Sequence, residues 1–110
     1  MARVSVVLLL LLACLLGQIG VAEAVERTYT AWWPVPARST VMRHISCSWY
    51  TYLGRRGVVV GGSAQTRDAY VGYNNHRVTT QGVVNNGYSA TAENHEAVAV
   101  QLGVSVVCAH

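Results

Sequence analysis

Residues 98–108 read VAVQLGVSVVC, and this stretch decides the fold class. Every second residue from Val98 to Cys108 is aliphatic or cysteine, and the residues between them are small or polar apart from Val107. Successive side chains of a strand point to opposite faces, so the alternation predicts a strand with one buried face. We therefore expect Cys108 to point into the core beside the valines.

A helix is the competing interpretation for the first part of this region. Ala92–Leu102 has Thr91 in front of it as a candidate N-cap, Glu93 and Glu96 in the first turns and Gly103 behind it as a candidate C-cap. The run of β-branched valines favours the strand, because such side chains lose rotamer freedom in a helix. Helix and strand both stay open for 92–102 at this point.

A second long strand, with a bend somewhere along it, is predicted for Val41–Leu53. The residues in phase on its apolar face are Val41, Ile45, Cys47, Trp49 and Leu53. Cys47 therefore faces the core independently of Cys108, and the two predict a buried disulfide with Trp49 near it. Closing about sixty residues in this way stabilises the fold by about 4 kcal/mol in the chain-entropy model.

The chain begins with the pattern of a secretory signal peptide. Arg3 precedes an apolar run over Val4–Leu16, and Ala22 and Ala24 fit the subsites of a signal peptidase. We expect cleavage after Ala24, with residues 1–24 as the signal peptide and 25–110 as one secreted, extracellular domain in which the disulfide forms. A lipoprotein signal acylated at Cys14 is the rival interpretation, but apolar residues continue beyond Cys14, where polar ones would be expected.

The rest of the chain predicts short strands separated by turn residues. We expect strands at Thr28–Trp33, ended by Pro34 and Pro36, and at Val58–Val60, joined to the long strand by a turn at Gly54–Gly57 and ended by Gly61 and Gly62. Further strands are expected at Ala69–Tyr73, Val78–Val84 and Tyr88–Ala92, with a hairpin at Asn85-Asn86-Gly87. The predicted fold is all-β: a small antiparallel β-sandwich or barrel with one disulfide.

The cysteine spacing is similar to that of the immunoglobulin sandwich, but the other markers of that family are absent. No tryptophan follows Cys47 by a dozen residues, and no tyrosine precedes Cys108 by two. An immunoglobulin domain is therefore not expected.

The charge is mildly basic, with a formal net charge of +3. The arginines beyond the leader are scattered: Arg27, Arg38, Arg43, Arg55, Arg56, Arg67 and Arg77. This pattern lacks the cluster expected for nucleic-acid binding, but it is compatible with peripheral contact at anionic membrane or cell surfaces. We expect a monomer whose partner is a macromolecule or a cell surface.

Catalytic machinery is not expected. His44, His76, His95 and His110 have no metal-ligand spacing, and no Gly-x-Ser-x-Gly motif occurs. We therefore predict no enzyme, no cofactor and no metal site.

Aromatic and basic residues are the candidate binding residues. Trp32 and Trp33 point to opposite faces of a strand, so one indole can stay at the surface. The residues expected to make contacts are Trp32, Trp33, Tyr50, Tyr52, Arg55 and Arg56. The predicted function is that of a small secreted binding protein, antimicrobial or toxin-like at anionic cell surfaces. A secreted inhibitor or receptor ligand is one alternative, and a precursor of an amidated peptide processed at Gly54-Arg55-Arg56 is another.

Overall fold

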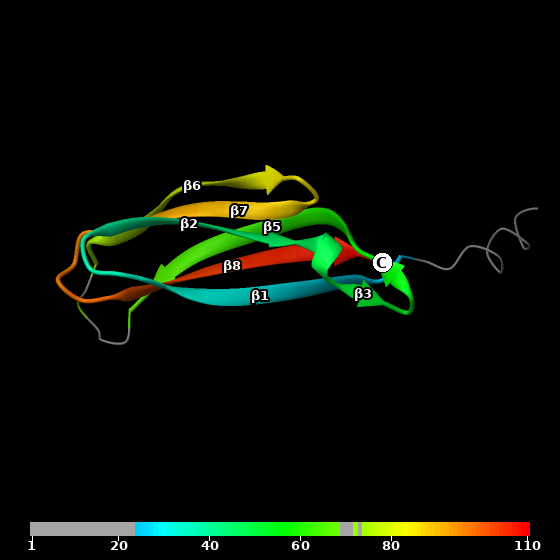
Figure 1. Ribbon diagram of the computed structural model, residues 1–110, viewed down its shortest axis with the longest axis horizontal. Coiled ribbons are helices and arrows are strands. Elements are labelled where there is room, and N and C mark those ends of the chain that lie inside the picture. The colour runs from blue at the N-terminus through cyan, green and yellow to red at the C-terminus, as the bar shows by residue number, and fades with distance from the viewer. Residues whose placement is uncertain (1–23, 69–71, 73) are drawn as a thin grey trace, which may run out of the picture.

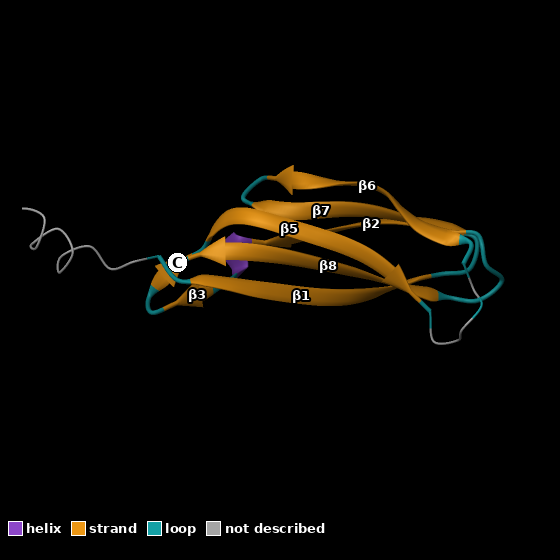
Figure 2. Cartoon of the chain, turned by 180° about the vertical axis from the view of Figure 1, so that it is seen from behind, coloured by secondary structure: helices purple, strands orange, loops and turns teal. Residues whose placement is uncertain are grey.

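The computed structural model describes residues 24–68, 72 and 74–110. These residues form two three-stranded antiparallel sheets and one small two-stranded sheet (Figures 1 and 2). The strands in chain order are β1 (Glu26–Val35), β2 (Ser39–Ser46), β3 (Thr51–Tyr52), β4 (Arg55–Arg56), β5 (Val58–Arg67), β6 (His76–Val84), β7 (Gly87–Asn94) and β8 (Val100–Ala109). The all-β class with antiparallel sheets is confirmed. The predicted signal peptide lies outside the described residues, except for Ala24.

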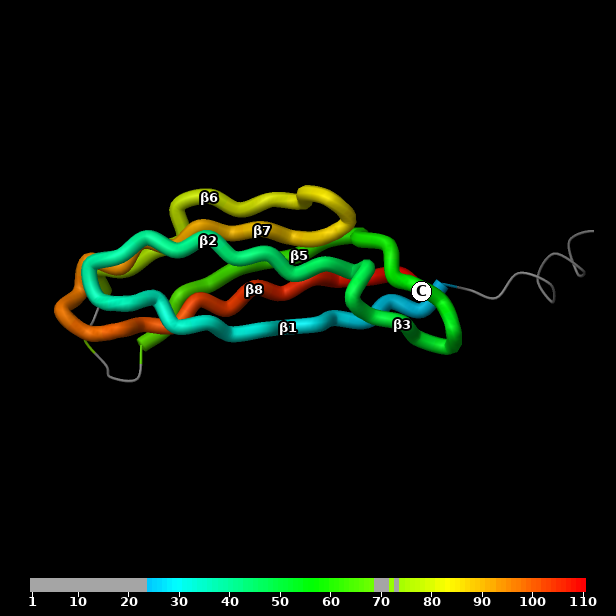
Figure 3. Tube along the Cα trace, viewed as in Figure 1, coloured from blue at the N-terminus to red at the C-terminus, as the bar shows by residue number. Residues whose placement is uncertain are grey.

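The two larger sheets have the strand orders β1-β8-β5 and β2-β7-β6, and they lie in two layers (Figure 3). Consecutive strands therefore often belong to different layers, as when the chain crosses from β1 to β2. The last two strands, β7 and β8, are each at the centre of one sheet. The alternating C-terminal stretch thus forms a central strand with neighbours on both sides.

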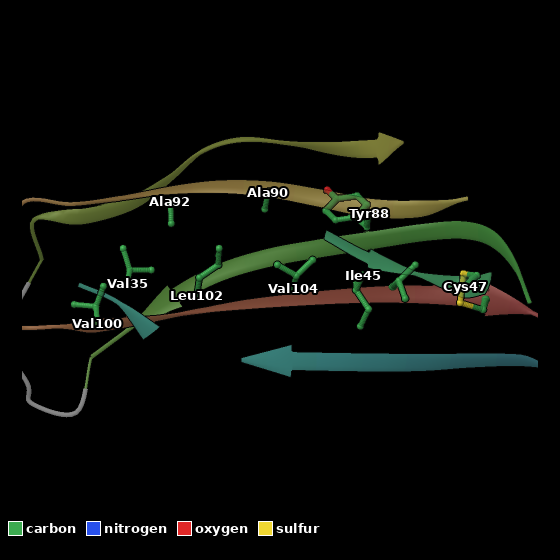
Figure 4. Close-up of a cluster of buried hydrophobic side chains, with 11 residues drawn as sticks. Val35, Ile45, Cys47, Tyr88, Ala90, Ala92, Val100, Leu102 and Val104 are labelled. Atoms are coloured by element: carbon green, nitrogen blue, oxygen red, sulfur yellow. A yellow bond between two sulfur atoms is a disulfide. The ribbon is translucent and has the colours of Figure 1, made fainter. Parts of the chain in front are cut away.

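The core lies between the facing sides of β8 and β7 (Figure 4). Val100, Leu102, Val104, Val106 and Cys108 from β8 are buried, as the alternation predicts. Opposite them, β7 contributes small side chains, Ala90 and Ala92, together with Tyr88. Val98, in contrast, lies before β8 and is exposed.

The helix predicted as an alternative for 92–102 does not form. The chain leaves β7 at Asn94, whose buried side-chain Oδ1 accepts a hydrogen bond from the Glu96 backbone N–H at 2.9 Å. The Asn94 Nδ2 donates to the carbonyl oxygens of Val98 and Val35 at 2.8 and 3.1 Å. These bonds turn the chain towards the other sheet, so residues 95–99 form a loop and not the first part of a strand.

The strand predicted for Val41–Leu53 is not only bent, as expected, but interrupted, so its prediction as one element is wrong. β2 ends at Ser46, and a single 3₁₀ turn, η1 (Cys47–Trp49), follows it before β3 begins. The Ser46 hydroxyl caps this turn by accepting a hydrogen bond from the Ser48 backbone N–H at 3.1 Å. The turn shifts the alternation, so that Cys47 is buried whereas Trp49 is 61% exposed.

The disulfide between Cys47 and Cys108 is confirmed. Both residues are fully buried, and their Cα atoms are 5.6 Å apart. The bond connects the turn after β2 to the last strand of the opposite sheet, and so joins the two layers at one end. Trp49, which was expected near the bond, belongs to the same turn as Cys47, but it is exposed and its ring meets that of His44 edge-on, with centroids 6.0 Å apart.

The turn after Tyr52 also differs from the prediction. Leu53 and Gly54 are the two turn residues, both with left-handed φ (53° and 72°), and Arg55–Arg56 form a strand that pairs with Thr51–Tyr52. The strand expected at Val58–Val60 does not stop at Gly61. β5 continues to Arg67 beside β8, with a bulge between Val59 and Gly61, so it pairs with β8 and not with its predicted hairpin partner.

The first strand is longer than predicted, because Pro34 lies within β1, opposite Gln101. β1 is an edge strand, where the missing N–H of proline can face away from the ladder. Of the later strands, Val78–Val84 and Tyr88–Ala92 fall within β6 and β7. The strand predicted at Ala69–Tyr73 lies outside the described residues, apart from Gly72.

The hairpin between β6 and β7 is confirmed, although its turn residues are Asn85 and Asn86, with φ of 48° and 55°. Gly87 is the first residue of β7 and pairs with Val84. Asn86 also connects this turn to the start of β5, since its Oδ1 accepts from the Val59 backbone N–H at 2.8 Å and its Nδ2 donates to the Gly57 carbonyl at 3.0 Å.

Candidate functional site: the basic hairpin end

The β3–β4 hairpin stands on a cluster of aromatic side chains at the disulfide end of the molecule. The rings of Tyr29 and Tyr50 stack with their centroids 3.9 Å apart. His110 meets the edges of Tyr29 and Tyr52, with ring centroids 5.8 and 6.0 Å apart. Strands β1 and β3 and the C-terminal residue are thereby packed together.

His110 connects the hairpin to β1 through its two ring nitrogens. The Arg55 carbonyl can only accept, so Nδ1 donates to it at 3.0 Å. In the neutral ring, Nε2 then accepts from the Tyr29 hydroxyl at 2.9 Å. His110 is buried, and it fixes the backbone of Arg55, a residue predicted to make contacts.

Arginines surround this hairpin. The guanidinium of Arg27 lies over the Tyr52 ring, 4.4 Å from its centroid. Arg55 pairs with Tyr52 and Arg56 with Thr51, so the two exposed arginines point to opposite faces of the hairpin. The end of the molecule therefore carries cations on both sides.

Ion pairs in the described part of the chain lie away from this end. They join Arg77 and His95 to Glu93, and His76 to Asp68. No ion pair of the described residues includes Arg27, Arg55 or Arg56. Glu26 precedes Arg27 in β1, where alternation points its side chain to the other face.

Large apolar side chains are exposed at the same end. Leu53, at the hairpin tip, is 76% exposed, and Trp49 and Val58 are each 61% exposed. Sequence reasoning missed Leu53 as a contact residue because it was assigned to the apolar face of a continuous strand. The sequence does hold a signal for Leu53. Two-residue turns favour Asn, Asp or Gly, so an apolar leucine at the first position of such a turn suggests a role other than forming the turn.

Trp32 and Trp33 do not join this cluster. Trp33 packs against the core, whereas Trp32 lies on the outer face of its sheet, against Gly103 and under the Arg67 guanidinium, 3.9 Å from the ring centroid. The six predicted contact residues thus divide into two groups: Tyr50, Tyr52, Arg55 and Arg56 at the hairpin, and the two tryptophans farther along β1.

Other polar groups occupy the rest of the molecule. His44 Nδ1 and Ser89 Oγ lie 2.6 Å apart as a cross-strand pair of β2 and β7. His76 bridges Thr66 and Asp68, with distances of 2.8 and 3.2 Å. A cavity of about 450 Å³ lies beside Asp68 and is lined also by Pro34, Arg67 and Gln101. Within the described residues, no group of three or more His, Cys, Asp or Glu side chains is arranged to hold a metal ion.

Comparisons with protein-family models, with curated proteins and with solved structures give no match for this chain. Among the residues that the structure describes, no helix is long and apolar enough to cross a membrane. Function has to be inferred from the residues themselves.

Proposed function

We propose that the protein is a small secreted binding protein without catalytic machinery, and that it acts at anionic cell surfaces in the manner of an antimicrobial protein or toxin. The observation that carries the proposal is the excess of positive charge at the hairpin. Arg27, Arg55 and Arg56 gather there without an ion pair in the described chain and outnumber the nearby Glu26, whereas Asp68 and Glu93 are paired elsewhere. A patch with an excess of one sign steers a protein towards a surface of the other sign.

The rigid base of the hairpin supports a binding role. The Tyr29–Tyr50 stack, the bond from His110 to the Arg55 carbonyl and the disulfide all lie beneath it. A contact surface that is already ordered loses little conformational entropy on binding. Two of the residues predicted to make contacts, Arg55 and Arg56, are exposed on this support.

Processing to an amidated peptide at Gly54-Arg55-Arg56 is less well supported. Arg55 and Arg56 are paired with β3, and the cysteines of the disulfide lie on either side of the site in the chain. Fragments cut there would stay joined. The mass of the secreted product after reduction of the disulfide tests this: a fragment ending at Leu53 would favour the precursor.

A secreted inhibitor or receptor ligand is the second candidate. Its support is a shallow cavity of about 290 Å³ on the outer face of the β2-β7-β6 sheet, with Thr80 and Val84 among its lining residues. Loss of the protein's effect on cells in Val84→Asn, with hairpin variants unaffected, would select this alternative.

The anionic-surface proposal is tested by co-sedimentation with phosphatidylcholine vesicles, with and without phosphatidylglycerol. We expect binding only to the mixed vesicles, weakening as salt is raised. The double variant Arg55→Gln/Arg56→Gln should bind about twenty-five-fold more weakly, since each arginine near such a surface contributes about a fivefold gain. Arg38→Gln/Arg43→Gln removes the same charge from exposed positions elsewhere and should bind clearly better than the hairpin variant.

Absence of binding to the mixed vesicles at low salt would contradict the proposal, as would equal losses in the two double variants. Release of a trapped dye from the same vesicles separates a toxin-like action from binding alone.

A further inference from the structure

We infer that the β3–β4 hairpin is a membrane anchor: Leu53 enters the apolar boundary of an anionic phospholipid bilayer while Arg27, Arg55 and Arg56 contact the lipid phosphates. The inference rests on the proposed function and names the phospholipid bilayer as the surface that the hairpin binds.

Leu53 is unfavourable where it stands, for two independent reasons. Its side chain is 76% exposed at the tip of the hairpin, so the folded chain gains little from its apolar surface. Its backbone has a φ of 53°, in the left-handed region that bulky side chains rarely adopt. Strained backbone of this kind occurs preferentially at functional sites, and a contact outside the chain would bury the exposed side chain.

The residues around Leu53 match the layers of a bilayer interface. Arg55 and Arg56 flank the tip on opposite faces of the hairpin, and Arg27 lies over Tyr52 just behind it. When Leu53 enters the boundary between headgroups and acyl chains, the three arginines behind it lie at the level of the lipid phosphates.

Trp49 provides a further interfacial group. It belongs to η1, which packs beside β4, and its indole is 61% exposed. Tryptophan is enriched at membrane–water interfaces, because its ring is apolar and its N–H still finds a hydrogen-bond partner there. The indole thus lies on the same end of the molecule as the tip.

A bilayer fits this combination better than an anionic polymer does. A polymer without acyl chains can neutralise the arginines, but it offers no apolar phase to Leu53. A single short apolar group binds membranes only weakly, so stable attachment needs a basic patch as a second signal. Leu53 provides the apolar group and the three arginines provide the basic patch, so the hairpin end carries both signals.

Leu53→Asn is the decisive variant, because asparagine tolerates the left-handed turn and removes the apolar tip. We expect its partitioning onto phosphatidylcholine–phosphatidylglycerol vesicles to fall about tenfold, which corresponds to partial burial of one leucine side chain. Met42→Asn likewise replaces an exposed apolar side chain by asparagine, but on the outer face of the β2-β7-β6 sheet, where Met42 is 68% exposed. Its partitioning should equal that of the wild type.

Beads coated with dextran sulfate supply negative charge without acyl chains. On these beads Leu53→Asn should bind like the wild type, and its urea unfolding midpoint should be no lower than that of the wild type. The anchor is overturned if Leu53→Asn keeps wild-type vesicle binding, if Met42→Asn loses as much, or if the beads show the same loss as the vesicles.

The two proposals fail differently. If Arg55→Gln/Arg56→Gln weakens vesicle binding and Leu53→Asn does not, then the anionic-surface function stands and the anchor falls. If the wild type binds neither vesicles nor beads at low salt, both fall.

Discussion

Trp32 and Gly103 form a matched pair of residues on the outer face of the β1-β8-β5 sheet. A Cβ atom at Gly103 would lie only 2.6 Å from the Trp32 ring, so the indole covers the space that a side chain would fill. Arg67 stacks on the indole at 3.9 Å. The aromatic ring offsets the missing side chain of a glycine in the middle of a strand.

Gly103→Ala should therefore displace the Trp32 indole and lower the free energy of unfolding by about 1–3 kcal/mol, the range for overpacking. Urea unfolding measures the loss, and a change in tryptophan fluorescence reports the displacement. Gly82→Ala is the matched control, because a Cβ there meets nothing within 4 Å. Equal effects of the two substitutions would show that the Trp32 contact is not the cause.

The edge strands of the two larger sheets are protected against pairing with another chain. Each larger sheet leaves two edge strands, and each edge carries a feature that hinders pairing with another chain. Pro34 lies in β1, and β5 and β6 have bulges after Val59 and Val78. In β2, Arg43 lies opposite Ala90 on the core-facing side, yet it is exposed. These features favour the monomer expected from the sequence, and sedimentation velocity would test that prediction.

The turn between β6 and β7 offers a test at the scale of elements. Asn85 and Asn86 both have left-handed φ, which glycine also adopts, but the Asn86 side chain additionally bonds the Val59 N–H and the Gly57 carbonyl. Asn86→Gly should therefore lower the free energy of unfolding by about 1–3 kcal/mol through unsatisfied polar groups. Asn85→Gly should be close to neutral. Thermal unfolding of both variants measures these changes. A larger loss of unfolding free energy in Asn85→Gly than in Asn86→Gly would refute the role assigned to Asn86.

At the scale of the whole molecule, the disulfide holds the two layers together at the end that carries the hairpin. Cys47 follows an edge strand of one sheet and Cys108 lies in the central strand of the other, 61 residues apart in the sequence. The Asn94 hydrogen bonds to Val35 and Val98 hold the loops beyond the other ends of these sheets. The two layers are thus joined at one end by the disulfide and at the other end by the Asn94 hydrogen bonds, and the core packs between these ends.

The double variant Cys47→Ala/Cys108→Ala should lose about 4 kcal/mol of unfolding free energy, the value expected for a loop of this length. Equilibrium urea unfolding under oxidising conditions measures it, with the wild type under reducing conditions as the comparison. A loss below about 1 kcal/mol would mean that the bond contributes little to stability. Vesicle binding at temperatures where the variant stays folded then reports whether the disulfide also orders the hairpin.

Prediction from the sequence succeeded where a local pattern coincides with burial. The alternation over β8 identified a buried face, and the phases of Cys47 and Cys108 identified their bond. It failed at η1, where a capped turn three residues long interrupts the alternation and exposes Trp49. It failed also for the pairing of β5, because β-branched runs carry no information about which strand lies beside them.

The sequence by itself determined the all-β class and the core-facing residues of the last strand, because each depends on alternation along single segments. It also predicted the disulfide, because Cys47 and Cys108 each face the core by the alternation of their own segment. Only the tertiary structure decided which strands pair, that Trp32 and Trp33 lie apart from Tyr50 and Tyr52, and that His110 reaches back to the Arg55 carbonyl. These features join residues distant in the chain. The free energy that selects them comes from packing between segments, which no single segment contains.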